Sequence, residues 1–175
     1  MVDQICQYFG GPYDPQRHSY RTPQLSVPGV VMGTVRRAKP KRWDNADFYL
    51  GAAGQPIGCA LMFRLSPGTE SREGFGGETA GLKKVSHSVD VFAFVRAFAP
   101  YAEDVQDALY GVQAAIRSHI HADRTCGSGG IEVGGFLVGE SPPWIRWQDS
   151  EVESTAEKTE ALAIGRFAAN EYIIA

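Results

Sequence analysis

The residues best suited to carry out chemistry lie together in the segment HIHADRTCGSGG, residues 119–130. His119, His121, Asp123 and Cys126 are of the types that bind metals or form a Cys–His nucleophile pair. Positions two apart on a helix point about 200° apart, so the two histidines share no helix face. We favour the simpler interpretation that they complement the dipole at a helix C-terminus. A Cys126-dependent enzyme is the less favoured alternative, and we expect no catalysis, metal or cofactor.

Two further motifs have simple explanations. The GSGG of residues 127–130 lacks the Lys-Ser/Thr of a phosphate-binding loop and does not open a helix, so it predicts a turn. His87 lies near Asp90 on an expected strand with no nucleophile nearby in the sequence, which indicates a surface residue.

A basic run precedes Trp43 and includes five cationic side chains. These are Arg36, Arg37, Lys39, Lys41 and Arg42. Such a run could contact phosphates without sequence preference, pair with the acidic surface of a neighbouring copy, or form a solvated loop. The net charge of −3 argues against a free nucleic-acid-binding module.

Charge is distributed unevenly along the chain. Residues 1–98 hold 12 basic and 8 acidic residues, a net charge of +4, whereas residues 99–175 hold 5 and 12, a net charge of −7. This asymmetry favours association with a second copy or with an oppositely charged neighbour, although small domains often vary this much by chance.

An amphipathic helix over residues 102–121 is the clearest element that positions these side chains. Glu103 and Asp104 begin it, where the helix dipole favours acidic residues. Its apolar residues recur at helical spacing and are Val105, Leu109, Val112, Ile116 and Ile120. Strands are expected over residues 27–35, 57–65, 87–98, 131–139, 144–153 and 158–174, and a short strand precedes the Gly-Pro turn in the segment DFYLGAAGQP. The alanine-rich content of residues 158–174 would also allow a helix, but the Leu162/Ile164 alternation favours the strand.

These elements predict an α+β fold in which a mixed, mostly antiparallel sheet packs on one long helix. Residues 26–175 form the single domain, and residues 1–25, with three prolines and little periodicity, form an extended N-terminal arm. Residues 66–82 are rich in glycine and poor in apolar residues, which predicts a long loop.

Composition favours a soluble protein of a reducing compartment. The three cysteines, Cys6, Cys59 and Cys126, are odd in number and far apart, which suggests neither a disulfide framework nor a zinc site. The N-terminus lacks the pattern of a signal peptide, and no apolar run has the length of a membrane helix.

The expected strand HSVDVFAFVRAF, residues 87–98, has two apolar faces. Valines and alanines line one face, and Phe92, Phe94 and Phe98 line the other, with Asp90 and Arg96 among them. A strand in a small sheet normally buries only one face. Because one helix covers one face of a sheet, we expect a second cover from the arm, the loops or another subunit.

The segment from Val89 to Pro142 resembles the middle of the tail terminator and tail-completion proteins of long-tailed bacteriophages. The shared order is a strand, a helix with an acidic start, a turn like D-x-T-x-G-G and a further strand. The turn matches Asp123, Thr125, Gly127 and the glycines that follow. The closing strand TEALAIGRFAANEYI also has the EYI ending of the family, and the match covers residues 82–175. Family members often have a clear N-terminal helix, which the first 80 residues of this chain do not predict.

The resemblance implies a structural virion protein and not an enzyme. Family members form a six-fold ring that caps the finished tail tube and docks to the head side. The implied partners are further copies in a hexameric ring, the tail tube protein, the head–tail connector protein and DNA passing through the lumen without sequence specificity. Assembly would take place in the host cytoplasm. Another neck, head–tail connector or head-completion protein is the alternative.

The resemblance also assigns roles to residues. A ring neighbour would cover the row Phe92, Phe94, Arg96 and Phe98. The basic run would line a DNA channel or a subunit interface. The loop residues Arg72, Glu73 and Phe75 would reach the tube or the connector.

Overall fold

A computed structural model of the chain describes residues 1–40, 44–48, 57–72, 82–98, 102–130, 135–139, 145–147, 151–154 and 158–174. Within these residues, the helices are α1 (Val2–Gly10), the 3-10 helix η1 (Asn45–Asp47) and α2 (Ala102–Ala122). The strands are β1 (Tyr13–Asp14), β2 (Ser19–Tyr20), β3 (Val31–Arg36), β4 (Ile57–Arg72), β5 (Leu82–Ala97), β6 (Phe136–Val138), β7 (Arg146–Trp147), β8 (Glu151–Ser154) and β9 (Thr159–Ile174).

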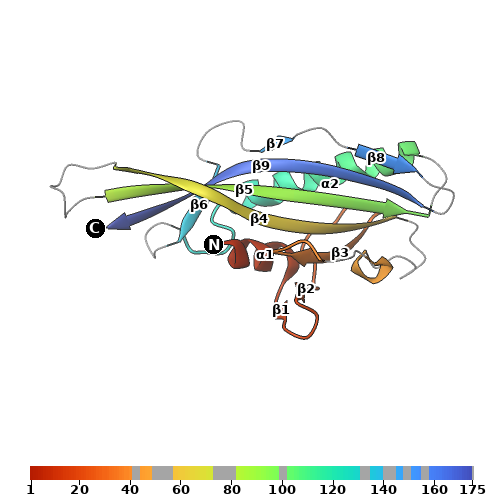
Figure 1. Cartoon of the computed structure of the whole chain (residues 1–175), viewed down its shortest axis with the longest axis horizontal. Helices are drawn as coiled ribbons and strands as arrows, with labels where there is room; N and C mark the ends of the chain where they lie inside the picture. Colours follow the sequence, from red (N-terminus) through yellow and green to blue (C-terminus); the bar gives the residue numbers. More distant parts are fainter. Residues whose placement is uncertain are drawn as a thin grey trace.

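The strands join in one sheet with the order β1-β2-β3-β4-β5-β9-β6, and β7 and β8 also pair with β9. The β3–β4 pair is parallel and the other pairs are antiparallel. The long strands β4, β5 and β9 form the centre, and at one end they project beyond the helices to the C-terminus (Figure 1). The predicted α+β class with a mixed, mostly antiparallel sheet is confirmed.

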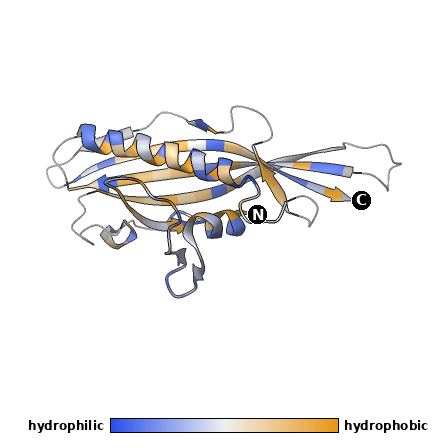
Figure 2. Cartoon of the chain, turned by 180° about the vertical axis from the view of Figure 1, so that it is seen from behind, coloured by the Kyte–Doolittle hydropathy of each residue, from blue (hydrophilic) through white to orange (hydrophobic). Residues whose placement is uncertain are grey.

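Both α-helices pack on the same face of the sheet (Figure 2). The predicted apolar stripe of α2, from Val105 to Ile120, is buried, which confirms this helix. The two helices also contact each other: the Tyr8 hydroxyl donates a hydrogen bond to the His119 carbonyl at 2.8 Å, and the two rings stack. The helices thus form one layer over one face.

The predicted alternation of β5 is confirmed on the face that the helices cover. Val89, Val91, Ala93, Val95 and Ala97 point to this side and are fully or almost fully buried. Their partners on β9 are small or apolar, as at Ala161, Ala163 and Phe167. Aliphatic strand residues and the apolar stripe of α2 therefore form the core.

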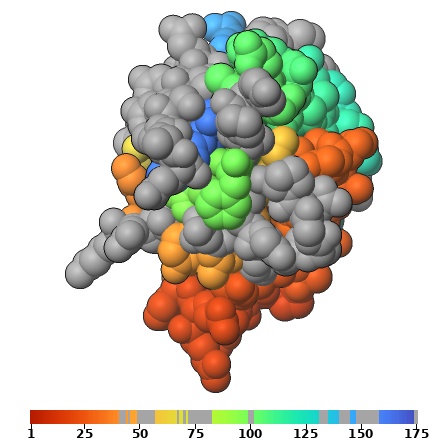
Figure 3. Space-filling model, turned by 90° about the vertical axis from the view of Figure 1, so that its right-hand side faces the viewer, coloured from red at the N-terminus to blue at the C-terminus, as the bar shows by residue number. Residues whose placement is uncertain are grey.

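Residues 1–25, expected as an arm, contribute a helix and a short hairpin. Ile5, Cys6 and Phe9 fall on one side of α1 and are fully buried, because their spacing matches a helical turn. At Gly10 an added Cβ would lie 2.5 Å from the Cβ of Tyr20, so only glycine allows this close contact. The β1–β2 hairpin projects from the body of the molecule (Figures 1 and 3). The polar and proline-rich composition hid the short helix, whose stability comes from packing.

The loop predicted over residues 66–82 is shorter in the structure, because β4 continues to Arg72 and β5 begins at Leu82. A register shift between Ser66 and Thr69 marks a bulge in β4. Side chains such as Ser71 beyond the bulge are exposed. Strand pairing here needs no apolar face, so the polar composition misled the loop prediction.

Most of the other strand predictions hold with different lengths. The short strand expected in DFYLGAAGQP lies outside the described residues except at its start, where Asp47 ends η1. The C-terminal strand is confirmed as β9. The expected strand over residues 131–139 is limited to β6 among the described residues, and the strand over residues 144–153 appears as β7 and β8. The first expected strand begins later, at Val31, as β3.

Candidate functional site

The sheet face opposite α1 and α2 carries an apolar centre, and we call it the open face. Strand register places two rows on it: Ala60–Phe94–Leu162 and Met62–Phe92–Ile164. The Phe92 and Phe94 rings stack with their centroids 6.4 Å apart. Both rings are only partly buried, as are Leu162 and Ile164. Neither α-helix packs on this face (Figures 1 and 2), and the partial exposure of these four side chains leaves some apolar area accessible, although Ala60 and Met62 are buried.

A cavity of about 450 Å³ lies over this apolar centre, and we call it the basic groove. Its floor is formed by Met62, Phe92, Phe94 and Leu162. Its rim is formed by Arg37, Ala38, Lys39 and Arg64. An apolar floor beside cations fits a partner that presents an apolar side chain next to a negative charge.

A cluster of two arginines and one carboxylate flanks the apolar rows. Asp90, 1% exposed, accepts hydrogen bonds from Arg64 Nη2 at 2.8 Å and from Arg166 Nε at 2.7 Å. Burial alone would raise the pKa of Asp90, but the hydrogen bonds from Arg166 and Arg64 outweigh it, and the pKa is lowered. The arginine side chains are 59% and 50% exposed, so the cluster presents excess positive charge to solvent.

A second ion pair flanks the apolar rows at their other end. Arg96 Nε donates to Glu160 Oε1 at 2.5 Å, and Lys158 Nζ lies 3.1 Å from the same oxygen. The Arg96 guanidinium also lies 4.3 Å from the centroid of the Phe48 ring. Burial acts to raise the pKa of Glu160, but hydrogen bonds from Lys158 and Arg96 lower it. Arg96, which we expected at a subunit interface, is therefore buried and paired within the chain itself.

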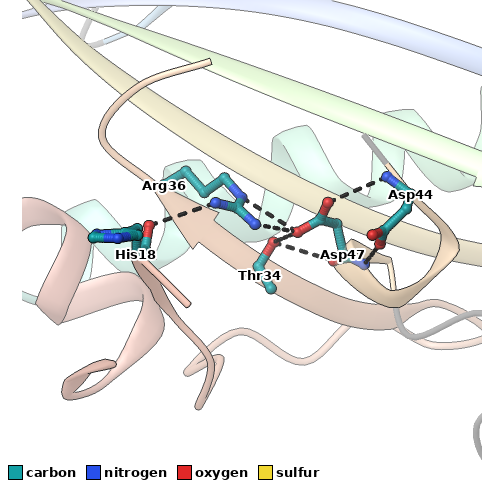
Figure 4. Close-up of polar contacts among 5 residues, drawn as sticks. All are labelled: His18, Thr34, Arg36, Asp44 and Asp47. Atoms are coloured by element: carbon teal, nitrogen blue, oxygen red, sulfur yellow. Dashed lines mark hydrogen bonds and ion pairs between the residues drawn. The ribbon is translucent and has the colours of Figure 1, made fainter. Parts of the chain in front are cut away.

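The basic run divides into residues with different surroundings. Arg36 forms a largely buried ion pair with Asp47, its Nη2 2.5 Å from Oδ1 (Figure 4). Asp47 also accepts hydrogen bonds from the Thr34 hydroxyl and from the Asp44 backbone N–H, which ties η1 to β3. Arg36 therefore holds the fold together.

Arg37 and Lys39 lie on the rim of the basic groove and are exposed. Arg37 Nη1 pairs with Asp3 Oδ1 at 2.8 Å on the surface. Lys41 and Arg42 are outside the residues that the structure describes. The described part of the run thus borders the open face.

The remaining predicted interface and loop residues lie apart from the groove lining. Phe98 follows the end of β5 and is 51% exposed. Arg72 is the last residue of β4 and pairs with Lys83 in the ladder. Glu73 and Phe75 are outside the described part of the chain.

The segment with catalytic residue types has a structural role. Asp123 Oδ1 accepts hydrogen bonds from the Thr125 backbone N–H and hydroxyl, and Oδ2 accepts one from the Gly127 N–H. The matched turn is therefore built by the Asp123 carboxylate. Cys126 is 2% exposed, and burial, with a smaller effect of Asp123, raises the pKa of its thiol to about 12. These surroundings disfavour the thiolate that a nucleophilic cysteine needs.

The residues that the structure describes contain no group of three or more His, Cys, Asp or Glu side chains placed to hold a metal ion. Neither α-helix is long and apolar enough to cross a membrane.

Sequence reasoning missed the neighbours of the phenylalanine row. Met62 and Leu162 complete the groove floor, and Arg64 and Arg166 hold Asp90. The alternation of apolar residues along each strand could be recognised in the sequence. The sequence did not show which residues of β4, β5 and β9 pair with one another, and this register brings the four side chains together. A pattern of matching charges on three expected strands is the signal that could have suggested the Asp90 cluster.

Comparison with known proteins gives no assignment. No protein-family model matches the chain, and no curated protein matches it.

Proposed function

We propose that this chain is a structural virion protein, a tail terminator that forms a ring of about six copies on the tail tube. It would end tube growth by presenting to the last tube ring a surface that does not template another. The observation that carries the proposal is the open face, where Phe92 and Phe94 form an accessible apolar floor beside cations. A ring neighbour would cover the part of this floor that remains accessible.

Two features of the fold support the resemblance to tail terminator and tail-completion proteins. The helix α1 supplies the N-terminal helix that family members often carry. The order of β5, α2, the Asp123 turn, β6 and β9 follows the order of elements on which the resemblance rests.

The projecting ends of β4, β5 and β9 suit contact beyond the subunit. They extend past the helices as a three-stranded arm (Figure 1). In a ring, such an arm could reach a neighbour, the tail tube or the head–tail connector. A connector or head-completion protein would use the same features, so the partner distinguishes the two functions.

The first test measures the mass of the purified protein in solution across a concentration series. The protein is then mixed with tail tubes assembled from the tail tube protein encoded in the same genome, and the mixture is imaged by negative-stain electron microscopy. We expect rings of about six copies in solution or rings at tube ends. Binding to a connector but not to tubes would favour the alternative function. A monomer that ignores both partners would contradict both proposals.

The Phe94→Asp variant tests the role of the open face. We expect it to block ring formation while leaving the helical circular dichroism signal almost unchanged, because Phe94 is only partly buried in the subunit. Leu65→Asp is the matched control, since Leu65 is an exposed apolar residue of β4 on the other side of the sheet. Unchanged assembly of Phe94→Asp would remove the interface interpretation.

A further inference from the structure

We infer that the basic groove receives helix α2 of a second copy of this chain, with Tyr110 entering the apolar floor and Asp107 facing Lys39. The inference rests on the proposed ring, because it names the contact that joins neighbouring subunits.

The groove offers positive charge beside an apolar surface. Lys39 is exposed and forms no ion pair with any residue that the structure describes. Arg37 pairs only at the surface with Asp3, and Arg64 shares the single carboxylate of Asp90 with Arg166. The rim therefore keeps excess positive charge close to the Phe92 and Phe94 rings. A segment with carboxylates one helical turn from an aromatic ring matches this arrangement.

Helix α2 presents such a segment on its outer side. Glu103, Asp107 and Tyr110 follow one another at spacings of four and three, so they form one exposed stripe. Tyr110 is 51% exposed, which is high for a large aromatic side chain. Gln106 Nε2 donates a hydrogen bond to the Tyr110 hydroxyl at 2.8 Å and helps to orient the ring. Tyrosine in such a position is typical of protein interfaces.

The two surfaces lie on opposite faces of the sheet. The groove opens on the open face, whereas α2 lies on the other side (Figures 1 and 2). A contact between them is heterologous, because each copy uses its groove for one neighbour and its helix for the other. Such contacts close into a ring when the rotation between copies allows it. The surfaces also bring the basic N-terminal part of one copy against the acidic C-terminal part of the next.

A charge exchange tests the Lys39–Asp107 contact. We expect Lys39→Glu alone and Asp107→Lys alone each to raise the concentration for half-maximal assembly about tenfold. The double variant restores the opposite charges, so we expect it to recover most of this loss. Arg17→Glu, a charge reversal at an exposed residue of the projecting β1–β2 hairpin, is the control and should change assembly less than about twofold. Single variants without effect, or losses that simply add in the double variant, would overturn the docking of α2.

Zero-length cross-linking gives a second readout that does not depend on a variant. A carbodiimide joins a lysine amine to a carboxylate that touches it. In assembled protein mixed from light and nitrogen-15-labelled copies, we expect peptides that link Lys39 of one isotope to Asp107 or Glu103 of the other. Assembled rings without such mixed peptides would contradict the inference.

The outcomes separate the two proposals. Rings that form but ignore the charge exchange and lack the cross-link overturn only the docking of α2. A protein that remains monomeric with and without tubes overturns the proposed function as well. Restoration by the double variant supports both.

Discussion

The two faces of the central sheet differ although the same strands build them. On the face that α1 and α2 cover, β5 contributes aliphatic side chains such as Val89, Val91 and Val95, which are almost fully buried. On the open face it contributes Phe92 and Phe94, which are partly buried, and Asp90, which is buried and paired with two arginines. Alternate residues of one strand thus occupy two different environments.

The two faces differ in how far the chain itself covers their apolar side chains. The helix-covered face buries its apolar groups within the chain, so its side chains stabilise the fold. The open face keeps accessible apolar area between two ion-paired clusters, which is the area that the proposed ring contact would use. Variants on the two faces should therefore separate loss of folding from loss of assembly.

The largest expected loss of stability comes from truncating a leucine of the core, compared with the same change on the open face. Leu109→Ala removes a fully buried side chain of α2 and should lower the free energy of unfolding by about 3 kcal/mol. Leu162→Ala truncates a partly buried side chain of the open face and should cost about 1 kcal/mol. Urea denaturation of both variants measures the difference. Equal losses would mean that the open face is packed as tightly as the core.

A smaller effect is expected when the carboxylate of the open face is neutralised. Asp90→Asn should lower the free energy of unfolding by about 2 kcal/mol at neutral pH, because hydrogen bonds to two arginines are weakened. Solvent around the half-exposed arginines keeps this value below that of a fully buried pair. Ser66→Ala is the control, since its hydroxyl lies 3.4 Å from Asp90 Oδ2 and contributes little. An equal loss in both variants would argue against the ion pairs.

The same carboxylate determines a pH dependence. Because the pKa of Asp90 is lower in the folded protein than in the unfolded chain, its contribution is complete above about pH 4 and is lost as the pH falls through the folded pKa. Glu160 acts in the same direction. Asp90→Asn should therefore lose less stability between about pH 5 and about pH 3 than the unaltered protein does, as thermal unfolding would measure.

The smallest effect on stability is expected at the rim of the groove. Arg37→Gln removes an exposed ion pair with Asp3, so the free energy of unfolding should fall by less than about 0.5 kcal/mol. The matched variant Arg36→Gln removes the largely buried pair with Asp47 and should cost about 2 kcal/mol. Similar losses in the two variants would show that the exposed Arg37–Asp3 pair stabilises the fold as much as the buried Arg36–Asp47 pair does.

Much of the fold was predictable because it depends on local periodicity. The spacing of Val105 to Ile120 identified α2, and the alternation around Phe92 identified the parity of β5. The helix α1 was missed because its nine residues are stabilised by packing against β3 and β4. The extension of β4 past Ser66 was missed because polar ladder residues look like a loop.

Only the phenylalanine row and the basic run of the candidate site could be predicted from the sequence. The phenylalanine row was visible in the sequence, whereas the Asp90 cluster and the groove floor combine residues from β4, β5 and β9. The basic run was also visible, but the sequence alone did not separate Arg36, which pairs inside the fold, from Lys39, which lies on the rim.

The sequence by itself determined helix α2, the central parts of the long strands and the two-sided character of β5, because hydrophobic period is a local property of the chain. Only the tertiary structure decided which side of β5 the helices cover and which cations meet the open face. Those outcomes depend on strand register and on contacts between residues far apart in the chain, as between Asp90 and Arg166. Such contacts form only when the whole sheet is assembled, so no local pattern of residues specifies them.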